Sequence, residues 1–285
     1  MNLQSWVGRT ETLEDTVTAT PMAALSATLD RPSARPAPGT ALPPIWHWLY
    51  FLPLAPQSEL GEDGHPRRGG FLPPVALPRR MWAGSQLEFR QPLRVGDAIT
   101  RTSTILSIEE KSGRSGQLVF VRIGHEIRRN GATDVALTET HDIVYREAAR
   151  PDDPVPPARP APEDAAWEKR WHPDDTLLFR YSALTFNSHR IHYDRRYVTE
   201  VEGYPGLIVH GPLLATLLLD GLRHQMPDAE VAAFSFRAMK PVFDTHDFVV
   251  CGAPKADAPA PAKVFRLWVK DHTGALNMDA TATLR

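Results

Sequence analysis

The sequence predicts an α+β protein built from two similar halves, in each of which a long antiparallel sheet wraps round one central helix. In both halves an apolar run suited to a buried helix precedes several runs in which apolar and polar residues alternate. Alternation with a period of two is typical of strands buried on one face. A proline-rich stretch, 149–166, has the composition of an extended linker. We therefore expect an N-terminal half at 1–148 and a C-terminal half at 167–285.

Two pairs of segments indicate that the halves arose by internal duplication. Residues 87–90 (LEFR) resemble residues 234–237 (FSFR) at an offset of 147 residues. Residues 119–132 contain a Val-Phe pair and a Gly-Ala turn, and resemble residues 264–275 at offsets of 143–145 residues. Offsets this similar are expected when one structural unit is repeated along a chain.

The first half begins with segments that carry no catalytic motif. Apolar residues recur at helical spacing in residues 2–30, which predicts a leading helix. Prolines recur every few positions in residues 31–44, so this segment is expected to be a loop. The apolar run Ile45–Leu52 (IWHWLYFL) follows two prolines and ends at Pro53. We interpret this run as the central helix of the first half.

Residues 53–86 are too rich in glycine and proline for a simple connection. Long loops inside compact domains are usually lids or binding loops. Arginines next to aromatic rings are suited to bind phosphate groups and a purine ring. The residues concerned are Arg67, Arg68, Phe71, Arg79, Arg80 and Trp82. A solvated loop that packs across the other half is an equally good interpretation.

The rest of each half predicts strands. Between Leu87 and Arg146 the alternation predicts three or four long strands, with Asn130-Gly131 as a hairpin turn. The second half repeats the plan: Asp174–Tyr181 precedes a polar loop, a long apolar helix begins after His210, and strands are expected from residue 232 to residue 284. A helix followed by an antiparallel meander is thus predicted twice.

Composition excludes several classes of function. The formal net charge is −2, with 23% charged and 42% hydrophobic residues, so nothing favours binding to nucleic acid or to an acidic membrane surface. The chain contains no run of about 18 apolar residues that would span a bilayer. The first residues include early acidic side chains and are not a signal peptide. Cys251 is the one cysteine, which excludes a disulfide within the chain and predicts a small buried residue in a cytoplasmic protein.

The stretch Phe179–Leu219 carries the residues best suited to catalysis. The N-terminus of the apolar helix at Gly211 would direct N–H groups and the positive end of the helix dipole into an apolar interior, where they could stabilise an oxyanion. In the preceding polar loop, His192 lies five residues after Asn187, so the imidazole could exchange a proton while the amide polarises the same ligand. Alternatively, His189 and His192 are ordinary surface histidines of a loop.

The same residues carry a resemblance to a known family. The run Phe186–Asp194 (FNSHRIHYD), followed by His210 and Gly211, resembles the signature of the MaoC-like, R-specific enoyl-CoA hydratase/dehydratase family. That signature runs roughly Gly-Asp-x-Asn-Pro-x-His-x-Asp, with a His-Gly about twenty residues later. The resemblance implies a double hot-dog fold, a catalytic histidine at His192 and an oxyanion glycine at Gly211.

The family's catalytic Asp falls on Asn187, which has no acidic proton to exchange. An Asn at this place resembles a subgroup that includes mitochondrial 3-hydroxyacyl-thioester dehydratases and bacterial mesaconyl-C4-CoA (itaconyl-CoA) hydratases. The resemblance therefore implies an active hydro-lyase that adds water to an enoyl thioester. The alternatives are a 3-hydroxyacyl-thioester dehydratase of fatty acid synthesis and a non-catalytic acyl-CoA binding protein.

The resemblance also suggests how the substrate binds. Arg190, with Arg180, could pair the second carboxylate of a branched dicarboxylyl-CoA that is hydrated to citramalyl-CoA. A structural salt bridge between Arg190 and Asp194 is equally plausible. The other residues expected to bind the acyl-CoA are Ser188, His210, Arg79 and Arg80.

Two further functions are less well supported. A thioesterase of the same fold would need a carboxylate near the start of the helix, whereas Asp220 lies at its far end. A metal site formed by His189, His192 and His210 would lack a thiolate or a nearby carboxylate pair. We therefore expect no metal and no cofactor, and a monomer or homodimer whose partner is the acyl-CoA substrate alone.

Overall fold

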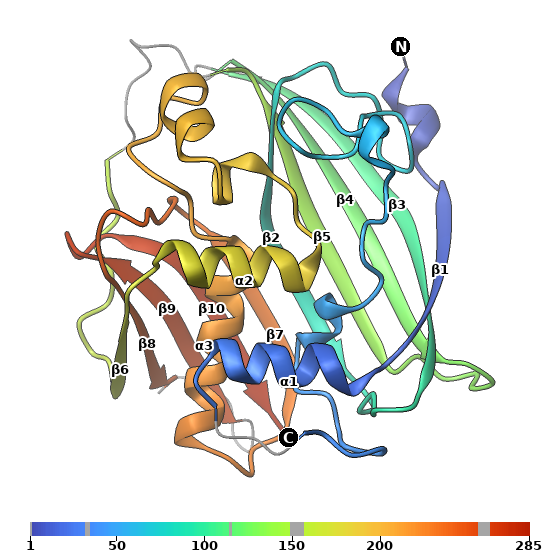
Figure 1. Cartoon of the computed structure of the whole chain (residues 1–285), viewed down its shortest axis with the longest axis vertical. Coiled ribbons are helices and arrows are strands. Elements are labelled where there is room, and N and C mark those ends of the chain that lie inside the picture. Colours follow the sequence, from blue (N-terminus) through green and yellow to red (C-terminus); the bar gives the residue numbers. More distant parts are fainter. Residues whose placement is uncertain (1, 32–34, 114–115, 149–156, 256–262) are drawn as a thin grey trace.

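The computed structural model describes residues 2–31, 35–113, 116–148, 157–255 and 263–285, so part of the expected linker lies outside the described residues. Ten antiparallel strands form one sheet in the order β1-β3-β4-β5-β2-β7-β10-β9-β8-β6 (Figure 1). The strands of the N-terminal half are β1 (Thr10–Thr16), β2 (Arg79–Phe89), β3 (Ala98–Gly113), β4 (Gly116–Arg129) and β5 (Leu137–Arg146). Those of the C-terminal half are β6 (Trp167–Trp171), β7 (Val231–Ala238), β8 (Phe248–Pro254), β9 (Lys263–Asp271) and β10 (Leu276–Leu284).

The two halves have the same strand order, which confirms the predicted double hot-dog arrangement with one correction. We expected two separate sheets. Instead, β2 and β7 pair with each other, from Gly84 opposite Arg237 to Glu88 opposite Ala233, and join both halves into one sheet. These two strands contain the similar segments 87–90 and 234–237, so the sheets join where the two copies of the repeat meet.

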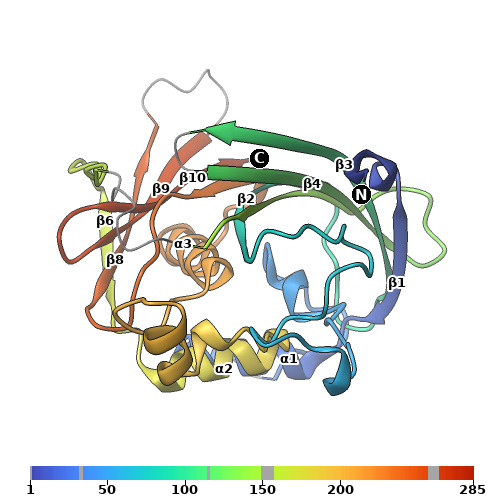
Figure 2. The ribbon, with the colours of Figure 1, turned by 90° about the horizontal axis from the view of Figure 1, so that it is seen from above.

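The C-terminal half contains the expected central helix, α3, at Gly211–Gln225. Every residue from Leu213 to Leu222 is buried, because the helix is apolar on nearly all sides and packs against β8, β9 and β10. Pro212 lies in the first turn, where its missing N–H breaks no helical hydrogen bond. Figure 2 shows the sheet curving over α3, with α1 (Ala19–Thr28) and α2 (Asp175–Thr185) packed together on the side away from the sheet.

The described part of the N-terminal half has no counterpart of α3, which corrects our interpretation of Ile45–Leu52. That run forms only a short 3-10 helix, η2, at Trp46–Leu49. Ile45 and Phe51, on either side of η2, have left-handed φ angles of 62° and 54°, which end any helix. The prolines before and after the run prevent a longer helix in either direction.

The first thirty residues also differ from the predicted leading helix. After a short 3-10 helix, η1 (Leu3–Trp6), residues Thr10–Thr16 form strand β1, in which exposed and half-buried side chains alternate. The threonines at alternate positions favour a strand because β-branched side chains pack well on a sheet. Only α1 is helical, and it packs beside α2.

The long loop predicted at 53–86 is shorter than expected. Residues 53–78 contain only the short η3 (Gln57–Glu59), and this segment runs beneath the strands of the N-terminal half (Figure 2). Strand β2 begins at Arg79, so Arg79, Arg80 and Trp82 lie on a strand. These side chains consequently have positions fixed by the sheet.

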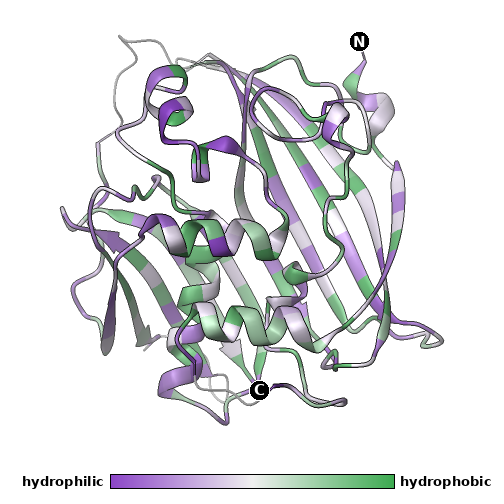
Figure 3. Ribbon diagram, viewed as in Figure 1, coloured by the Kyte–Doolittle hydropathy of each residue, from purple (hydrophilic) through white to green (hydrophobic). Residues whose placement is uncertain are grey.

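Hydropathy follows this architecture. In Figure 3 hydrophobic and hydrophilic residues alternate along the strands of the N-terminal half, as expected for a sheet with one buried face. Cys251 is fully buried on β8. No helix in the described part of the chain is long and apolar enough to cross a membrane.

Candidate active site

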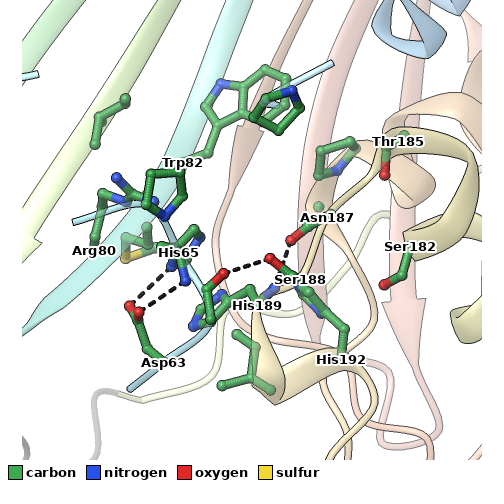
Figure 4. A pocket seen from close by; sticks show the side chains of 18 of the residues that line it. Asp63, His65, Arg80, Trp82, Ser182, Thr185, Asn187, Ser188, His189 and His192 are labelled. Carbon is green, nitrogen blue, oxygen red and sulfur yellow. Dashed lines mark hydrogen bonds and ion pairs between the residues drawn. The ribbon is translucent and has the colours of Figure 1, made fainter. Parts of the chain in front are cut away.

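A cavity of about 2800 Å³ is lined by residues of both halves. Its walls come from the loop at 60–68, the inner faces of β2–β5, the polar loop after α2 and the first turn of α3. Figure 4 shows the part where the polar loop meets the loop at 60–68. Because the first half has no central helix among its described residues, the inner face of its strands is open to this space.

His192 lines the cavity from the 3-10 helix η4 (Arg190–His192). Its Nδ1 lies 2.7 Å from the carbonyl oxygen of Ile208. A carbonyl can only accept, so Nδ1 carries the ring proton and Nε2 keeps its lone pair. Burial lowers the pKa of His192 to about 4, so the ring is neutral at neutral pH and Nε2 can act as a base.

Gly211 is the first residue of α3 and lines the same cavity. Among the described residues its N–H has no hydrogen-bond acceptor, as expected for the first N–H groups of a helix. A Cβ built on Gly211 would meet no atom within 4 Å, so the space in front of it is open. The N–H and the helix dipole therefore face a region that a ligand can occupy.

Asn187 lies where α2 has ended, just after Phe186, which has a left-handed φ of 49°. Its backbone N–H donates to the carbonyl of Ser182 at 2.8 Å, and its Oδ1 accepts from the N–H of His189 at 3.0 Å. The side chain is thus held by its oxygen. The part of Asn187 left for the cavity is the NH₂ group, which can only donate.

His210 is fully buried and does not line the cavity, which corrects the expectation that it contacts substrate. Its ring stacks on His192 with centroids 3.7 Å apart, and its Nε2 lies 2.8 Å from Ser182 Oγ. Burial and the nearby His192 hold the pKa of His210 well below its usual range. His210 therefore supports the ring of His192 from behind as a neutral side chain.

Arg190 does not line the cavity either, and the structure supports the alternative salt bridge. Its Nε and Nη2 donate to Asp194 Oδ2 at 2.9 and 2.7 Å, and its guanidinium lies over the ring of Tyr197. Arg180 is exposed on α2 and also lies outside the cavity wall. This corrects the expectation that Arg190 and Arg180 bind a substrate carboxylate.

The expected arginines of β2 do line the cavity. Arg79 donates to the carbonyl of Glu202 at 3.0 Å and lies 3.5 Å from the carboxylate of the same residue. Arg80 forms no ion pair with any carboxylate in the described part of the chain, and its charge lowers the pKa of His65 and of His189. Arg80 also contacts the hydroxyl of Tyr145, so it places beside the histidines a positive charge that no described carboxylate neutralises.

The N-terminal half contributes a buried acidic residue to the cavity wall. Glu139 on β5 is 3% exposed and accepts from His47 Nε2 at 2.8 Å and from Trp48 Nε1 at 3.2 Å. Its other oxygen lies 2.7 Å from His141 Nε2. Burial raises the pKa of Glu139, but the two histidines outweigh this effect and hold the carboxylate charged. His125 lies beside His141 and adds a further polar group to this wall.

Comparisons with known proteins identify the family of the chain. Residues 45–244 match the family described as hydroxyacyl-thioester dehydratase type 2. The chain belongs to this family. It is 48% identical over 253 residues to a mesaconyl-C(4)-CoA hydratase of Chloroflexus aurantiacus, covering 89% of each chain. It is 27% identical to the mitochondrial hydroxyacyl-thioester dehydratase type 2 of Schizosaccharomyces pombe, covering 74% of this chain and 78% of the relative. The chain is accordingly a hydro-lyase of the enoyl-thioester class.

Solved structures confirm the fold of this hydroxyacyl-thioester dehydratase family member. A MaoC-like dehydratase superposes with a TM-score of 0.72 at 15% identity, covering 99% of both chains. A Mycobacterium tuberculosis protein with a double hot-dog fold superposes with a TM-score of 0.61 at 14% identity, covering 98% of this chain and 96% of the other. The double hot-dog fold that the sequence resemblance implied is thus confirmed.

Sequence reasoning missed two parts of the dehydratase cavity. One is the Glu139 cluster, whose signal is the presence of polar residues at inward positions of β4 and β5. The other is Asp63 and His65, which lie in the loop already regarded as functional. Asp63, His65 and His189 have side-chain donor atoms within 4.8 Å of one another and could hold a cation. This group differs from the three histidines considered from the sequence.

Proposed function

We propose that this protein hydrates a branched dicarboxylyl-CoA, mesaconyl-C4-CoA or itaconyl-CoA, to citramalyl-CoA. The observation that carries the proposal is the pairing of two groups on one cavity: the unprotonated Nε2 of His192 and the free N–H of Gly211 at the start of α3. The substrate class is supported by the 48% identity to a mesaconyl-C(4)-CoA hydratase.

The two groups would act on different reacting atoms: Gly211 on the thioester oxygen and His192 on the water. When water adds to the β-carbon of the enoyl thioester, negative charge develops on the thioester oxygen. The N–H of Gly211 and the dipole of α3 would stabilise that charge, and a well-placed donor of this kind contributes about 3 kcal/mol. His192 Nε2 would accept a hydrogen bond from the water and orient it for attack, and a proton of that water is delivered to the α-carbon. The NH₂ group of Asn187 can donate to the water or to the thioester.

The cavity wall favours a short and polar acyl group. Glu139, His125 and Arg101 line the wall in the N-terminal half, and neither His125 Nε2 nor Arg101 Nε has a hydrogen-bond partner in the described part of the chain. A long alkyl chain against this wall would leave buried polar groups unsatisfied, at about 1–3 kcal/mol each. The unpaired charge of Arg80, near the histidines, is suited to the second carboxylate of the substrate.

The remaining expectations complete the proposal. We propose that the catalytic half is 167–285, after the linker at 149–166, and that the protein is a cytoplasmic monomer or homodimer. Arg79 would remain a contact for the CoA part of the substrate, because it lies on the cavity wall, held by Glu202. Ser188 would hold the polar loop in place, since its hydroxyl donates to the carbonyl of Gly64.

An absorbance assay tests the proposal. Purified protein is incubated with mesaconyl-C4-CoA, itaconyl-CoA and crotonyl-CoA, and loss of the enoyl-thioester absorbance is followed, with release of free thiol as the thioesterase control. We expect hydration that is fastest with a dicarboxylyl-CoA. His192→Ala should lower kcat by about 10³-fold, whereas His172→Ala, on an exposed histidine, should not. Thiol release, or no loss of absorbance with any of the three thioesters, would overturn the proposal.

A further inference from the structure

The segment 59–67 forms a compact loop on the cavity wall. Leu60 and Pro66 pair as a β-bridge, and the N–H of Gly61 donates to the carbonyl of His65 at 2.7 Å. Gly64, at the tip, has a φ of +85°, which favours glycine. The backbone of the segment is therefore held in one shape by its own hydrogen bonds.

Three consecutive carbonyls of this loop bind the catalytic loop of the other half. Arg190 donates from Nη1 to the carbonyl of Glu62 at 3.0 Å and from its backbone N–H to that of Asp63 at 2.9 Å. The hydroxyl of Ser188 donates to the carbonyl of Gly64 at 2.5 Å. A Cβ on Gly64 would lie 1.9 Å from the carbonyl oxygen of Ser188, so the two backbones approach too closely for any side chain there. The two loops thus form one unit.

The tip of this unit carries a carboxylate and an imidazole. Asp63 accepts from the backbone N–H of His65 at 3.0 Å and from His65 Nδ1 at 2.9 Å. Nδ1 therefore carries the ring proton, and Nε2 has a free lone pair with no hydrogen-bond partner among the residues described. Burial lowers the pKa of His65 and the bond to Asp63 opposes this, so the ring is neutral at rest.

This imidazole belongs to the same group as His192. The ring of His65 lies 3.9 Å from that of His189, which lies 5.5 Å from that of His192 (Figure 4). The charge of His65 is close enough to lower the pKa of His192. All three rings line the cavity, although His65 comes from the opposite half of the chain.

With Asn at position 187, the site lacks a proton acceptor that the signature provides. The signature that this loop resembles has an Asp at that position, which can accept a proton from water. Asn187 cannot be protonated at neutral pH, and its oxygen already accepts from the N–H of His189. A water molecule that adds to the substrate has two O–H groups, and His192 Nε2 can accept only one of them.

We propose that His65, held by Asp63, takes the proton of the water that His192 orients, so that the N-terminal half completes the active site. The inference rests on the proposed function, because it assigns a role in that reaction. His65 acts on the reacting water and is a catalytic residue, whereas Asp63 is a positioning residue. The half that carries no catalytic motif in its sequence thereby supplies the acceptor that Asn187 lacks.

The step balances without any further reactant. The water oxygen bonds to the β-carbon while the π electrons of the double bond move to the thioester oxygen at Gly211. One O–H of the water stays hydrogen-bonded to His192 Nε2, and the other gives its proton to His65 Nε2. The α-carbon then takes that proton from His65, and both rings return to their starting state. The carboxylate of Asp63 stabilises the transient imidazolium, which the neutral carbonyl beside His192 cannot do.

An isosteric variant tests this role. Asp63→Asn keeps an oxygen beside His65 and removes the charge, so it should lower kcat on mesaconyl-C4-CoA by about 10²-fold with little change in KM. The acidic limb of kcat/KM should move to lower pH, because losing the carboxylate lowers the pKa of the imidazole. Glu59→Gln is the matched control: its side chain is exposed and it lies in the same segment without lining the cavity, so both values should stay as in the wild type.

A second variant separates catalysis from structure. His65→Ala should lose activity by a similar factor, and added imidazole should restore part of it, which a purely structural role would not allow. Suppose that the wild-type protein hydrates the thioester and that Asp63→Asn has the wild-type kcat and pH profile. The roles assigned to His65 and Asp63 are then wrong, and the proposed function stands. If wild-type protein hydrates no enoyl thioester, both fail. Activity that a chelator abolishes and Zn²⁺ restores would show that Asp63, His65 and His189 hold a metal instead.

Discussion

The two halves of the sheet share one strand order but fill their concave faces in different ways. In the C-terminal half, β10 presents the buried residues Met278, Ala280 and Ala282, and the sheet encloses the apolar helix α3. In the N-terminal half, β5 takes the same place in the order and presents Glu139 and His141 to the cavity. One copy of the fold therefore holds a helix whose N-terminus faces the cavity, and the other copy leaves the corresponding space to the cavity itself.

The polar wall of the N-terminal half should be a structural requirement as well as a binding surface. Glu139→Ala leaves the buried His47 and the half-buried Trp48 and His141 without the carboxylate that they share. Removing one partner of a buried charged group costs about 3–5 kcal/mol, so we expect a loss of this size in the free energy of unfolding measured with urea. Glu126→Ala on the exposed face of β4 is the control and should change it by less than about 1 kcal/mol. Equal stability of both variants would show that Glu139 is not a structural centre of this wall.

The sequence predicts features that depend on neighbouring residues better than features that depend on contacts between distant segments of the chain. Strands β3–β5 follow from the alternation of apolar and polar residues, and α3 from its apolar run after Pro212, which are local properties; most of β2 falls instead in the loop predicted at 53–86. The missing central helix at Ile45–Leu52 does not follow from such patterns, because it depends on the left-handed turns at either end of the run. His192 and Gly211 were found through a motif, and both lie on the cavity as expected.

The remaining parts of the site depend on contacts between distant segments. The loop carrying Asp63 and His65 reaches the catalytic loop through its backbone carbonyls, which no sequence pattern reveals. The pair between Arg190 and Asp194, four residues apart, is by contrast local, and the sequence already offered it as an alternative to binding a substrate carboxylate. The roles of His192 and Gly211 in catalysis stay predictions, to be tested by the variants described here, and the role of Asn187 also stays a prediction.

The comparison also predicts which arginine recognises the acyl group. Arg80→Gln removes the positive charge that has no carboxylate partner among the described residues. For mesaconyl-C4-CoA, kcat/KM should therefore fall by about 10²-fold, since a charge-assisted bond contributes about 1.5–3 kcal/mol. The value for crotonyl-CoA, which has no second carboxylate, should stay almost unchanged. Arg190→Gln should change kcat/KM by the same factor for both substrates, because Arg190 is paired with Asp194 outside the cavity. If Arg80→Gln lowers kcat/KM equally for both substrates, the arginine binds the CoA part instead.

Both halves bury neutral histidines, which predicts a dependence of stability on pH. Burial lowers the pKa of His192 to about 4 and that of His125 to about 2, from 6.5. Below 6.5 the unfolded chain binds protons that the folded protein does not, so stability is full above pH 6.5 and falls as the pH approaches 4. Each group contributes at most about 1.4 kcal/mol for each pH unit. Urea unfolding at pH 7.5, 6 and 5 measures this slope, and His125→Gln should reduce it; a stability constant over that range would contradict the assignment.

The smallest effect on activity is expected at Gly211, where the start of α3 faces the cavity. Gly211→Ala adds a methyl group that touches no protein atom within 4 Å, so the fold should keep its melting temperature or gain slightly from the better helix former. The methyl group would project into the open space in front of the helix N-terminus. We therefore expect kcat/KM to fall by about tenfold, equivalent to about 1.4 kcal/mol, without loss of stability. Gly221→Ala in the same helix has the opposite signature, because its Cβ would lie 2.6 Å from the ring of Trp167 and should destabilise the fold. Full activity of a stable Gly211→Ala variant would mean that the thioester does not approach the start of α3, and that the helix of the C-terminal half is only structural.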